Sequence, residues 1–589
     1  MLDSSLSLTL YSLSRLSYHR HVKILTSAQM REVDRMTTER YGIPGLQLME
    51  NAAIAVVDSI ESKLGGLEGK RSIVLCGKGN NGGDGAAAAR HLHLRGARID
   101  LILLGKLEDT RGDARRNFEL AHAISSGQPD RFIFVEAHSQ QEFDRITQCL
   151  LPSDEPGFWA FTEGTDVARA TPFPIPMPPG VHYDLAVDAI FGTGLARPAS
   201  GLFERAIDFL AKSQSHGIPV VSVDIPSGIA SDSPDLIGPA VQADLTVTFT
   251  APKPASVLPP ACHYGGDLIV SSIGSPQDLI EEAASSLNLV EPRMIETWLA
   301  GSRRGPDANK GDVGKVLIVA GSRGKTGAAC LSGLAALRSG TGLVTVATAA
   351  SSQPVVASQL AIECMTEPLP ETESGSVSLD ALASVIDLAN QRDVLAVGPG
   401  LGASNDSTRE LVRGMVLNRS VPLVLDADGL NSLAPWDQSL KGTADLPIIL
   451  TPHPGEMARL TGKTIPEVVR GRVEIARQFA KEHSVIVVLK GSRTIVAATD
   501  GQVYINPTGN SGMATGGTGD VLTGIIAGLL AQKPDDPLGA VIIAVYIHGL
   551  AGDIAAGRVG TRAMIASDII DNLGEAFIQA GGLQERPSR

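Results

Sequence analysis

The sequence predicts an α/β protein of two domains, each with a mainly parallel sheet between layers of helices. Three observations lead to this prediction. The chain has 589 residues, which is long enough for more than one domain. Short apolar runs alternate with helical segments, a pattern typical of parallel strands joined by crossover helices. The alternation falls into two blocks, which a polar stretch at residues 301–310 separates.

The first block predicts a doubly wound parallel sheet. A polar helix over residues 27–38, with Thr26 as its N-cap, and a second helix over 46–64 precede this sheet. Strands are expected at 72–76, 99–104, 132–135, 185–190, 220–225 and 245–249, with helices between them at 84–95, 113–124 and 203–213. Residues 152–180 are rich in proline and have little period, which predicts a surface insertion.

The second block repeats the alternation without repeating the sequence of the first. Strands are expected at 315–320, 343–347, 394–397, 423–426, 448–450 and 485–489, followed by a hairpin of 494–498 with 503–505 that turns at 499–501. Long apolar helices are predicted at 519–530, 537–556 and 563–580. We therefore expect a first domain over 23–280, a linker or domain entry over 281–311, and a second domain over 312–583.

The first residues of the chain predict no folded element. Residues 1–22 have no strong amphipathic period, so we expect a disordered, dispensable tail or a mis-assigned start of translation. The segment lacks an apolar core followed by small residues, which argues against a secretory signal. Its composition leaves a mitochondrial-type presequence as the alternative.

The composition excludes several classes of protein. Hydrophobic residues make up 43% of the chain and charged residues 19%, which excludes a disordered acidic polypeptide. The net charge of −14 argues against a wide DNA-binding face, and 4% aromatic residues leave few platforms for stacking bases. We therefore expect small-molecule partners and no nucleic acid.

The cysteines and the apolar runs bear on the cellular location of the protein. Five cysteines stand far apart without a CxxC pair, which argues against a disulfide framework and a zinc site. A reducing, cytoplasmic location fits this pattern. No uninterrupted apolar run reaches the roughly 18–20 residues of a membrane helix. We expect no membrane partner, and buried helices at 524–531 and 541–547.

A glycine-rich loop directly after the first predicted strand marks a candidate ligand site. Residues 76–85 read Cys-Gly-Lys-Gly-Asn-Asn-Gly-Gly-Asp-Gly and open a helix. Glycines let backbone N–H groups approach a phosphate, and the helix N-terminus adds partial positive charge. The string is neither GxGxxG nor a Walker A loop. The alternative is a purely structural strand–turn–helix.

Two further strand ends carry polar groups. Asp188 ends one strand before a glycine loop, and Asp224 and Ser227 follow the next strand. Ligands of open α/β sheets bind beyond the carboxyl ends of the strands. Oxygens of Asn, Asp and Ser gathered there could also enclose a cation, although each Asp alone could merely cap a helix.

With these motifs the first block resembles the YjeF N-terminal domain, the NAD(P)H-hydrate epimerase family. The resemblance covers roughly residues 23–275 and rests on MENAA at 49–53, GNNGGDG at 79–85, VDAIFGTGL at 187–195 and DIPSG at 224–228. It implies a Rossmann-like three-layer αβα sandwich, a potassium ion held by Asn81, Asp188 and Ser227, and Asp188 as acid or base. It also implies that the hydrated dinucleotide contacts Asn80, Asn81, Gly82, Gly83, Asp84, Gly192, Thr193, Gly194, Leu195, Ala196, Arg197, Pro198 and Asp224.

The second block contains the strongest single motif, Asn-Ser-Gly-Met-Ala-Thr-Gly-Gly-Thr-Gly-Asp at residues 510–520, followed by an apolar helix. The glycines and the helix start predict an anion hole for phosphate oxygens. Asp520 stands where a base could take the proton of a hydroxyl that attacks a terminal phosphate. The alternative is an acidic residue favoured at a helix N-terminus by the macrodipole alone.

This block resembles the ribokinase-like superfamily and, more narrowly, the YjeF C-terminal family of NAD(P)H-hydrate dehydratases. The match spans about residues 290–580 and adds GKV at 314–316, GS at 321–322 with TGAA at 326–329, GPGLG at 398–402, DADGLN at 426–431, TPHPGE at 451–456 and LKG at 489–491. It implies a ribokinase-like αβα domain that phosphorylates the ring hydroxyl and then eliminates phosphate.

The resemblance also implies site residues for this second reaction. The adenine nucleotide would contact Lys490, Gly491, Ser492, Arg493, Thr494 and Gly519. The hydrated dinucleotide would contact Ala328, Gly402, His453 and Asp520. Magnesium would neutralise the nucleotide phosphates. The motifs do not distinguish ADP from ATP, although similarity to fused prokaryotic members favours ADP.

These resemblances lead to one main hypothesis and two alternatives. The main hypothesis is a bifunctional repair enzyme, a homo-oligomer, that interconverts R and S hydrates of NADH or NADPH and dehydrates the S form. The first alternative is a ribokinase-like kinase of a small alcohol with an N-terminal ligand-binding domain. The second is a scaffold or RNA-binding version of the first block, because a fold does not fix a function.

Overall fold

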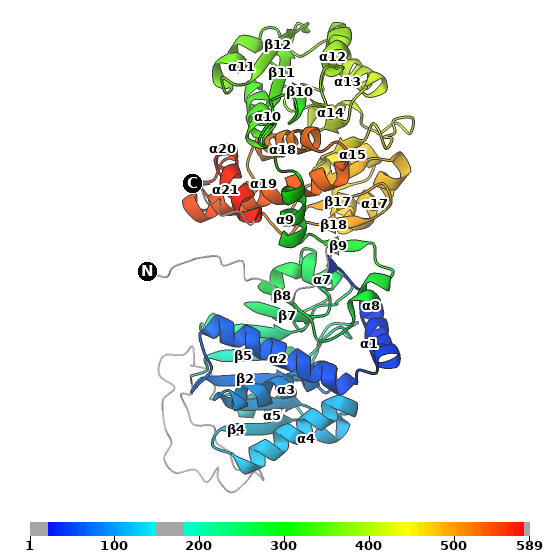
Figure 1. Ribbon diagram of the computed structural model, residues 1–589. Helices are drawn as coiled ribbons and strands as arrows, with labels where there is room; N and C mark the ends of the chain where they lie inside the picture. The colour runs from blue at the N-terminus through cyan, green and yellow to red at the C-terminus, as the bar shows by residue number, and fades with distance from the viewer. Residues whose placement is uncertain (1–21, 149–181, 582–589) are drawn as a thin grey trace. The chain divides into compact units, whose positions relative to one another are not determined.

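The computed structural model describes residues 22–148 and 182–581 (Figure 1). Most of the expected tail and the whole proline-rich segment 152–180 lie outside the described residues. The described chain forms two compact units: one runs from Lys23 to Ser285, and the other contains Val22 and the residues from Ser286 onward. Each unit has its own sheet and its own hydrophobic core. The two α/β units that the sequence predicts are therefore present.

The N-terminal unit has a seven-stranded sheet in the order β4-β3-β2-β5-β6-β7-β8. All of its neighbouring strands are parallel. Six strands match the predicted runs closely; β8 was not predicted because this edge strand is only partly buried and lacks a long apolar run. The strands are β2 (Arg71–Cys76), β3 (Arg98–Leu104), β4 (Phe132–Ala137), β5 (Leu185–Ala189), β6 (Val220–Val223), β7 (Leu245–Phe249) and β8 (Asp267–Ser271).

Helices cover both faces of this sheet, as the predicted three-layer sandwich requires. Along β2, Val74 belongs to the core under α2, α3 and α4, whereas Ile73 and Leu75 point to the core under α5 and α6. Thr26 caps α1 as predicted, since its side chain accepts a hydrogen bond from the Gln29 amide. The helices are α1 (Ser27–Tyr41), α2 (Gly45–Leu64), α3 (Asn80–Leu94), α4 (Gly112–Gly127), α5 (Gln140–Thr147), α6 (Leu202–Ser215), α7 (Pro254–Val257) and α8 (Gln277–Glu282).

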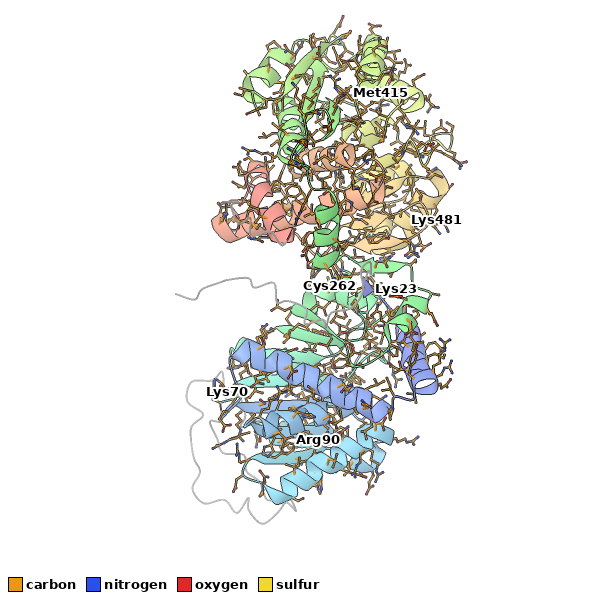
Figure 2. All side chains as sticks on the ribbon, in the orientation of Figure 1. Lys23, Lys70, Arg90, Cys262, Met415 and Lys481 are labelled. Atoms are coloured by element: carbon orange, nitrogen blue, oxygen red, sulfur yellow. The ribbon has the colours of Figure 1, made fainter. Side chains whose placement is uncertain are left out.

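A polar contact joins three helices on one face of this sheet. Arg90 of α3, labelled in Figure 2, donates to Glu50 of α2 and to Asn117 Oδ1 of α4, the latter at 2.6 Å. Glu50 also accepts from His91 Nε2 at 2.8 Å. Glu50 lies in the MENAA motif, and in this structure it fixes the helix layer beside the glycine loop.

The C-terminal unit has an eleven-stranded sheet in the order β1-β9-β18-β17-β16-β15-β14-β13-β10-β11-β12. From β12 to β16 all pairs are parallel, and β17 and β18 form the predicted antiparallel hairpin. The strands are β1 (Val22–Lys23), β9 (Leu287–Leu289), β10 (Lys315–Val319), β11 (Leu343–Ala349), β12 (Met365–Leu369), β13 (Val394–Val397), β14 (Leu423–Leu425), β15 (Ile448–Leu450), β16 (Ile486–Leu489), β17 (Ile495–Ala497) and β18 (Val503–Ile505).

One face of this sheet packs against α10, α18 and α19, and these helices share its main hydrophobic core. Helices on the other side include α13, whose Met415 is buried (Figure 2). The helices are α9 (Pro292–Gly301), α10 (Thr326–Arg338), α11 (Gln353–Gln359), α12 (Leu382–Ala389), α13 (Asp406–Asn418), α14 (Asp428–Ser432), α15 (Pro454–Thr461), α16 (Ile465–Arg470), α17 (Arg472–His483), α18 (Thr518–Gln532), α19 (Pro537–Val559), α20 (Ala566–Asp571) and α21 (Leu573–Ala580).

Three stretches differ from the sequence-based expectation. Residues 281–311, expected as a linker or domain entry, contain strand β9 and helix α9; β9 was not predicted because three residues are too few to stand out as an apolar run. Val22, expected in the tail, lies in β1. The single helix expected over 563–580 is two helices, α20 and α21, which meet at Asn572. The Asn572 side chain there donates to the Asp568 carbonyl at 2.7 Å, which closes the end of α20.

Helix α19 alone, among the helices in the described ranges, is long and apolar enough to pass a test for a membrane span. Its most apolar stretch is 78% buried inside the unit. The apolar character of α19 is therefore accounted for by its place in the hydrophobic core.

The contact between α10 and α18 depends on a missing side chain, and this gives a first prediction. A Cβ built on Gly524 of α18 would lie 2.2 Å from the Ser332 carbonyl oxygen of α10. Gly524→Ala should therefore destabilise the C-terminal unit by about 1–3 kcal/mol, measured as a lower urea midpoint.

Gly557→Ala is the matched control, because a Cβ at this exposed position of α19 meets no atom within 4 Å. It should be neutral or stabilising by up to about 1 kcal/mol, since alanine favours a helix over glycine. Equal urea midpoints for the two variants would contradict the tight approach of α10 and α18.

Candidate active sites

The first candidate site begins where β2 ends and α3 begins. Close backbone approaches require glycine at two points of this turn. A Cβ on Gly77 would lie 2.0 Å from the Ile190 carbonyl oxygen, and a Cβ on Gly82 would lie 1.8 Å from the Gly77 carbonyl oxygen. Helix α3 starts at Asn80, so the N–H groups of its first turn stand at the carboxyl edge of the sheet. The loop has the strand–turn–helix geometry that suits an anion.

Asp188, at the end of β5, is fully buried and its two carboxylate oxygens accept four hydrogen bonds. Oδ2 accepts from Ser222 Oγ and from the Ser227 amide, both at 2.8 Å. Oδ1 accepts from Ser227 Oγ at 2.5 Å and from the Ile190 amide at 3.3 Å. Burial raises the pKa of Asp188, whereas the hydrogen bonds oppose that rise. The network fixes this carboxylate and ties together the ends of β5 and β6.

Asn81, the third residue expected to hold potassium, lies on the first turn of α3. Its side-chain Nδ2 is buried and has no hydrogen-bond partner among the described residues. A Cβ built on Gly192 would lie 3.2 Å from Asn81 Oδ1, so the amide faces the loop that follows β5. An unsatisfied buried amide N–H fits a site where a bound ligand supplies the missing acceptor, whereas only the Oδ1 atom of this side chain could contact a cation.

The loop from Gly192 to Pro198 runs between β5 and α6 and is largely exposed. Ser231 Oγ donates to the Thr193 carbonyl at 3.2 Å, which holds one end of this loop. The loop lies next to the Asp188 network because Ser227 Oγ accepts from the Phe191 amide at 2.9 Å. The structure thus brings together the glycine loop, Asn81, Asp188, Ser227 and the start of the 192–198 segment.

Asp224, another predicted residue of this site, has an unusual backbone conformation, and its side chain contacts Lys253, which was not predicted as a site residue. Its φ is +67°, a left-handed conformation rare for a residue with a side chain. Its Oδ1 accepts from Thr248 Oγ1 at 3.0 Å and from the ammonium of Lys253. Lys253 stands in the stretch Thr-Ala-Pro-Lys-Pro, and a lysine between two prolines was the available signal.

Asp84, also predicted, shares this electrostatic environment. Burial raises its pKa well above the ordinary value, and Asp224 and Asp34 raise it further, whereas Lys253 opposes them. The first site therefore combines anion-binding backbone amides with a cluster of carboxyl groups that share one ammonium.

The second candidate site is built on the N-terminus of α18. Its N-cap, Gly517, has φ +92°, and α18 begins at Thr518. Two residues of α19 hold the segment around this helix start. Asp553 accepts from the Gly509 amide at 2.9 Å, and His548 Nε2 lies 3.0 Å from the Thr518 carbonyl oxygen. Because burial lowers the pKa of His548 to about 4, its ring is neutral and Nε2 is the donor. The predicted anion hole is thus anchored on the core helix.

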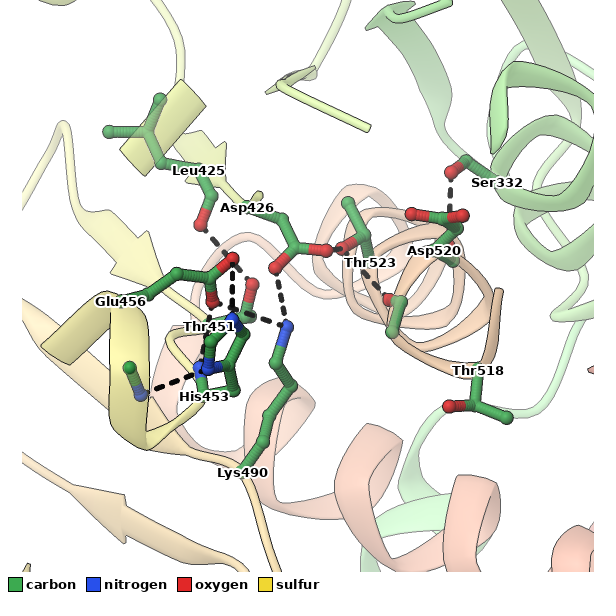
Figure 3. Close-up of polar contacts among 12 residues, drawn as sticks. Ser332, Leu425, Asp426, Thr451, His453, Glu456, Lys490, Thr518, Asp520 and Thr523 are labelled. Carbon is green, nitrogen blue, oxygen red and sulfur yellow. Dashed lines mark hydrogen bonds and ion pairs between the residues drawn. The ribbon is translucent and has the colours of Figure 1, made fainter. Parts of the chain in front are cut away.

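Asp520 stands on the first turn of α18 (Figure 3). Ser332 Oγ donates to its backbone carbonyl at 3.0 Å, so its carboxylate is not used in that contact. Burial and the nearby Asp426 raise the pKa of Asp520 to about 7, whereas Lys490 opposes the rise. A carboxylate with this pKa is suited to take and release a proton near neutral pH.

Lys490, predicted to contact the nucleotide, directly follows β16, and its side chain reaches Asp426 (Figure 3). Its Nζ donates to Asp426 Oδ1 at 2.7 Å and lies 3.9 Å from Glu456 Oε2. Burial alone would lower the pKa of Lys490, but Asp426 and Glu456 raise it. Thr523 Oγ1 donates to the other Asp426 oxygen at 2.8 Å, so Asp426 connects β16 to α18.

Gly519 lies against this pair, since a Cβ there would approach Lys490 Nζ to 3.2 Å. The structure therefore brings Lys490, Gly519 and Asp520 together. Asp426 and Glu456 stood in the quoted motifs but were not assigned as site residues. Their acidic side chains beside the predicted Lys490 were the available signal.

His453 caps α15 through its ring. Nδ1 accepts from the Gly455 amide at 2.9 Å, so the ring proton is placed on Nε2, which lies 3.5 Å from Glu456 Oε1. Burial lowers the pKa of His453 although Glu456 opposes this. About half of the side chain remains exposed, so a neutral donor is available to a ligand at the site.

The other predicted residues of the second site lie on loops at the same strand ends. The Gly402 amide donates to Asp428 Oδ2 at 2.8 Å, and Ala328 opens α10 beside the 398–402 loop. In the 490–494 turn, Arg493 has φ +55° and its Nη1 donates to the Pro507 carbonyl at 3.0 Å. These hydrogen bonds and close approaches shape each loop locally.

The side chains give different support to the two expected metals. Potassium favours several oxygens; Ser227 Oγ and Asp188 Oδ1 already lie 2.5 Å apart, and Asn81 Oδ1 faces the loop after β5. Within the described ranges, no group of three or more His, Cys, Asp or Glu side chains is placed to hold a metal. Asp426 and Glu456 already face Lys490, so a magnesium ion here would take most of its ligands from nucleotide phosphates and water.

Comparisons with known proteins fit this division into two sites. Residues 45–255 match the family described as YjeF-related protein N-terminus, and residues 316–574 match the family described as NAD(P)H-hydrate dehydratase. A bifunctional NAD(P)H-hydrate repair enzyme Nnr of Moorella thermoacetica is 42% identical over 93% of this chain and 96% of its own length. The repair enzyme of the same name in Escherichia coli K12 is 31% identical over 92% of each chain.

A crystal structure of the ADP/ATP-dependent NAD(P)H-hydrate dehydratase of Bacillus subtilis, co-crystallised with ATP and Mg²⁺, is 32% identical, with a TM-score of 0.42. It covers 48% of this chain and 97% of its own. The relatives that match nearly the whole length decide the assignment. The chain belongs to the family of bifunctional NAD(P)H-hydrate repair enzymes.

Proposed function

We propose that the N-terminal unit interconverts the R and S hydrates of NADH and NADPH and that the C-terminal unit dehydrates the S form at the expense of ADP or ATP. One observation carries this proposal. A single chain holds a glycine-loop site and an anion-hole site, and a bifunctional NAD(P)H-hydrate repair enzyme matches 93% of this chain. The small-alcohol kinase alternative does not account for the first site.

In the first site the backbone amides of the α3 N-terminus suit the phosphates of the dinucleotide. The hydrated ring carries a hydroxyl on the carbon next to its nitrogen, so inversion there requires proton transfer to and from an oxygen. Carboxyl groups at the strand ends can carry that proton. We propose that Asp188, whose oxygens are saturated by donors, acts chiefly by fixing the loops and a potassium ion with Asn81 and Ser227.

In the second site Asp520 is the base that takes the proton of the ring hydroxyl as its oxygen attacks the terminal phosphate. The N–H groups at the start of α18 face the transferred phosphoryl group. Lys490 lies beside Gly519 and Asp520 and can also face the negative charge of the transferred phosphoryl group. Elimination follows, because phosphate leaves more readily than hydroxide. Magnesium, when bound with the nucleotide, would neutralise phosphate charge.

We also propose that the enzyme works in a reducing compartment such as the cytoplasm. The four cysteines within the described ranges are free thiols, and two of them, Cys76 and Cys262, are buried. Free thiols in both units support a location where disulfides are not maintained.

The test of both activities is a recovery assay on a mixture of R and S hydrates with ADP or ATP. The full chain should convert the whole mixture to reduced cofactor, measured by the ultraviolet absorbance of the dihydronicotinamide ring and by chromatography of both epimers. A stable phosphorylated product without recovery of reduced cofactor would support the kinase alternative instead.

Asp520→Asn should abolish dehydration and spare epimerisation. Asparagine cannot accept the hydroxyl proton, and the loss of a general base costs about 10²–10⁴-fold in rate. Chromatography of an R-only sample would report epimerisation in the same preparation. Near-normal dehydration by this variant would remove Asp520 from the role of base.

The dehydration rate should depend on pH through Asp520. Only the deprotonated carboxylate is a base, and its pKa is about 7, so kcat should rise as pH increases through that value and level off above it. Rates at saturating substrate across this range, corrected for enzyme stability, give the measurement. A flat pH profile of kcat would contradict the prediction that ionisation of Asp520 controls the rate of dehydration.

Asp188→Ala should stop epimerisation and leave dehydration intact. The substitution leaves the Ser222 and Ser227 donors without their acceptor and removes a proposed potassium ligand. In the mixed-epimer assay only the S form should be consumed, and the reaction should then stall. Consumption of the R form at the wild-type enzymatic rate would place the epimerase site elsewhere.

A further inference from the structure

We propose that Asp34 is a catalytic proton-transfer residue of the first site and that Lys253 is its positioning partner, holding the Asp224 carboxylate at the same place. This inference rests on the proposed epimerase function and deepens it. Neither residue belongs to the glycine loop or the other motifs that mark the site, and they come from α1 and from the segment just before α7.

Lys253 is one of the most buried charged side chains of the unit, with 1% of its surface exposed. Its ammonium donates to Asp224, to Thr248 Oγ1 at 2.9 Å and to the Phe249 carbonyl at 3.3 Å. A buried ammonium with three acceptors is locked in place. Because Asp224 also has a left-handed backbone, the lysine fixes a carboxylate that the fold holds in a strained conformation.

Asp34, in contrast to Lys253, has a side-chain oxygen without a hydrogen-bond partner among the described residues. Its Oδ1 is buried and accepts no hydrogen bond from any described residue. Burial raises the pKa of Asp34 to about 6, Asp224 raises it as well, and Lys253 lowers it. The same three residues also affect the pKa of Asp84 on α3. The start of α1 packs against the segment that carries Lys253, because the Leu25 amide donates to the Pro252 carbonyl at 3.0 Å and Val33 packs with Ala251 in one hydrophobic cluster. Asp34 therefore lies on a helix that contacts the Lys253 segment and shares its electrostatic environment with Asp84, Asp224 and Lys253.

The other charged groups around α1 do not satisfy Asp34. Helix α8 packs against α1 and carries Asp278, Glu281 and Glu282, and two of these acids contact Tyr41 and Arg40 of α1. On α1 itself, Arg35 is exposed and binds Glu32 and Glu39. Three carboxyl groups thus share one ammonium, and Asp34 is the one with a buried oxygen left open.

This arrangement suits inversion of the hydrated ring. The Asp34 carboxyl gives its proton to the ring hydroxyl while the carbon–oxygen bond breaks, and water leaves with the bonding pair. The ring nitrogen lone pair forms the carbon–nitrogen double bond, and the resulting cation faces the carboxylate of Asp224. Water then adds to the opposite face and releases one proton to the solvent, and Asp34 takes up one proton from the solvent. The step consumes no other reactant.

The decisive variant is Asp34→Asn in the full chain, tested after the wild type has been shown to interconvert the epimers. We expect epimerisation to fall by about 10²-fold or more, with the dehydratase of the same chain unchanged as internal control. Glu32→Gln, on the same helix but exposed, is the matched control and should keep the wild-type rate.

Thermal stability separates a catalytic from a structural role. A carboxyl with a raised folded-state pKa favours the folded state below its unfolded pKa of about 4, and loses that contribution as pH rises through about 6. Asp34→Asn should therefore keep or raise the Tm above neutral pH while losing epimerase activity. A variant that loses activity and Tm together would indicate a structural role and overturn the proposal.

Lys253→Met tests the positioning role, because methionine keeps most of the apolar stem and removes the charge. We expect a lower epimerase kcat with a shifted pH profile, and partial rescue in Lys253→Arg. Should Lys253→Met fail to fold, Asp34→Asn alone decides. The proposal would be overturned if Asp34→Asn epimerised at the wild-type rate. It would also be overturned if the oxygen of the ring hydroxyl did not exchange with ¹⁸O-labelled water during turnover. A wild type without epimerase activity would instead refute the proposed function.

Discussion

Both units depend on one steric constraint at the carboxyl edge of their sheets. Directly after β2, a Cβ on Gly77 would lie 2.0 Å from the carbonyl oxygen of Ile190, in the loop after the neighbouring strand β5. Directly after β13, a Cβ on Gly398 would lie 1.9 Å from the Asp426 carbonyl oxygen, after the neighbouring strand β14. In each unit two loops therefore approach to backbone contact, and the polar groups that follow them are forced into one place.

The acidic residues gathered there fall into two kinds. Asp188 and Asp426 are buried and fully engaged by hydrogen bonds or by an ammonium, so they organise the loops. Asp520 and Asp34 are partly buried without such compensation, and their pKa values are raised to about 7 and about 6. Unequal compensation of neighbouring carboxyl groups is how a protein keeps one ionised and another able to carry a proton at neutral pH.

The sequence predicted the buried strands and the loops better than the edge strands and the side chains that distant segments bring together. Strands such as β2 and β13 are buried on both faces, so each is a continuous apolar run that can be recognised directly. The edge strands β8 and β12 are partly exposed and β9 has three residues, so none gives a clear run. Lys253 and Asp34 were missed for another reason: their relation to Asp84 arises only when separate elements pack together.

The position of β9 has a consequence for dividing the protein. Family motifs place the start of the second domain near the strand at Lys315, yet β9 (Leu287–Leu289) pairs with β18 through three residues of parallel register. A separately expressed C-terminal domain that begins after α9 would leave the hydrogen-bonding edge of β18 open and would lack the hydrogen bond from Trp298 of α9 to Asp536. An open strand edge invites pairing between molecules. Aggregation of such a fragment would then report a misplaced cut rather than a second domain unable to fold by itself.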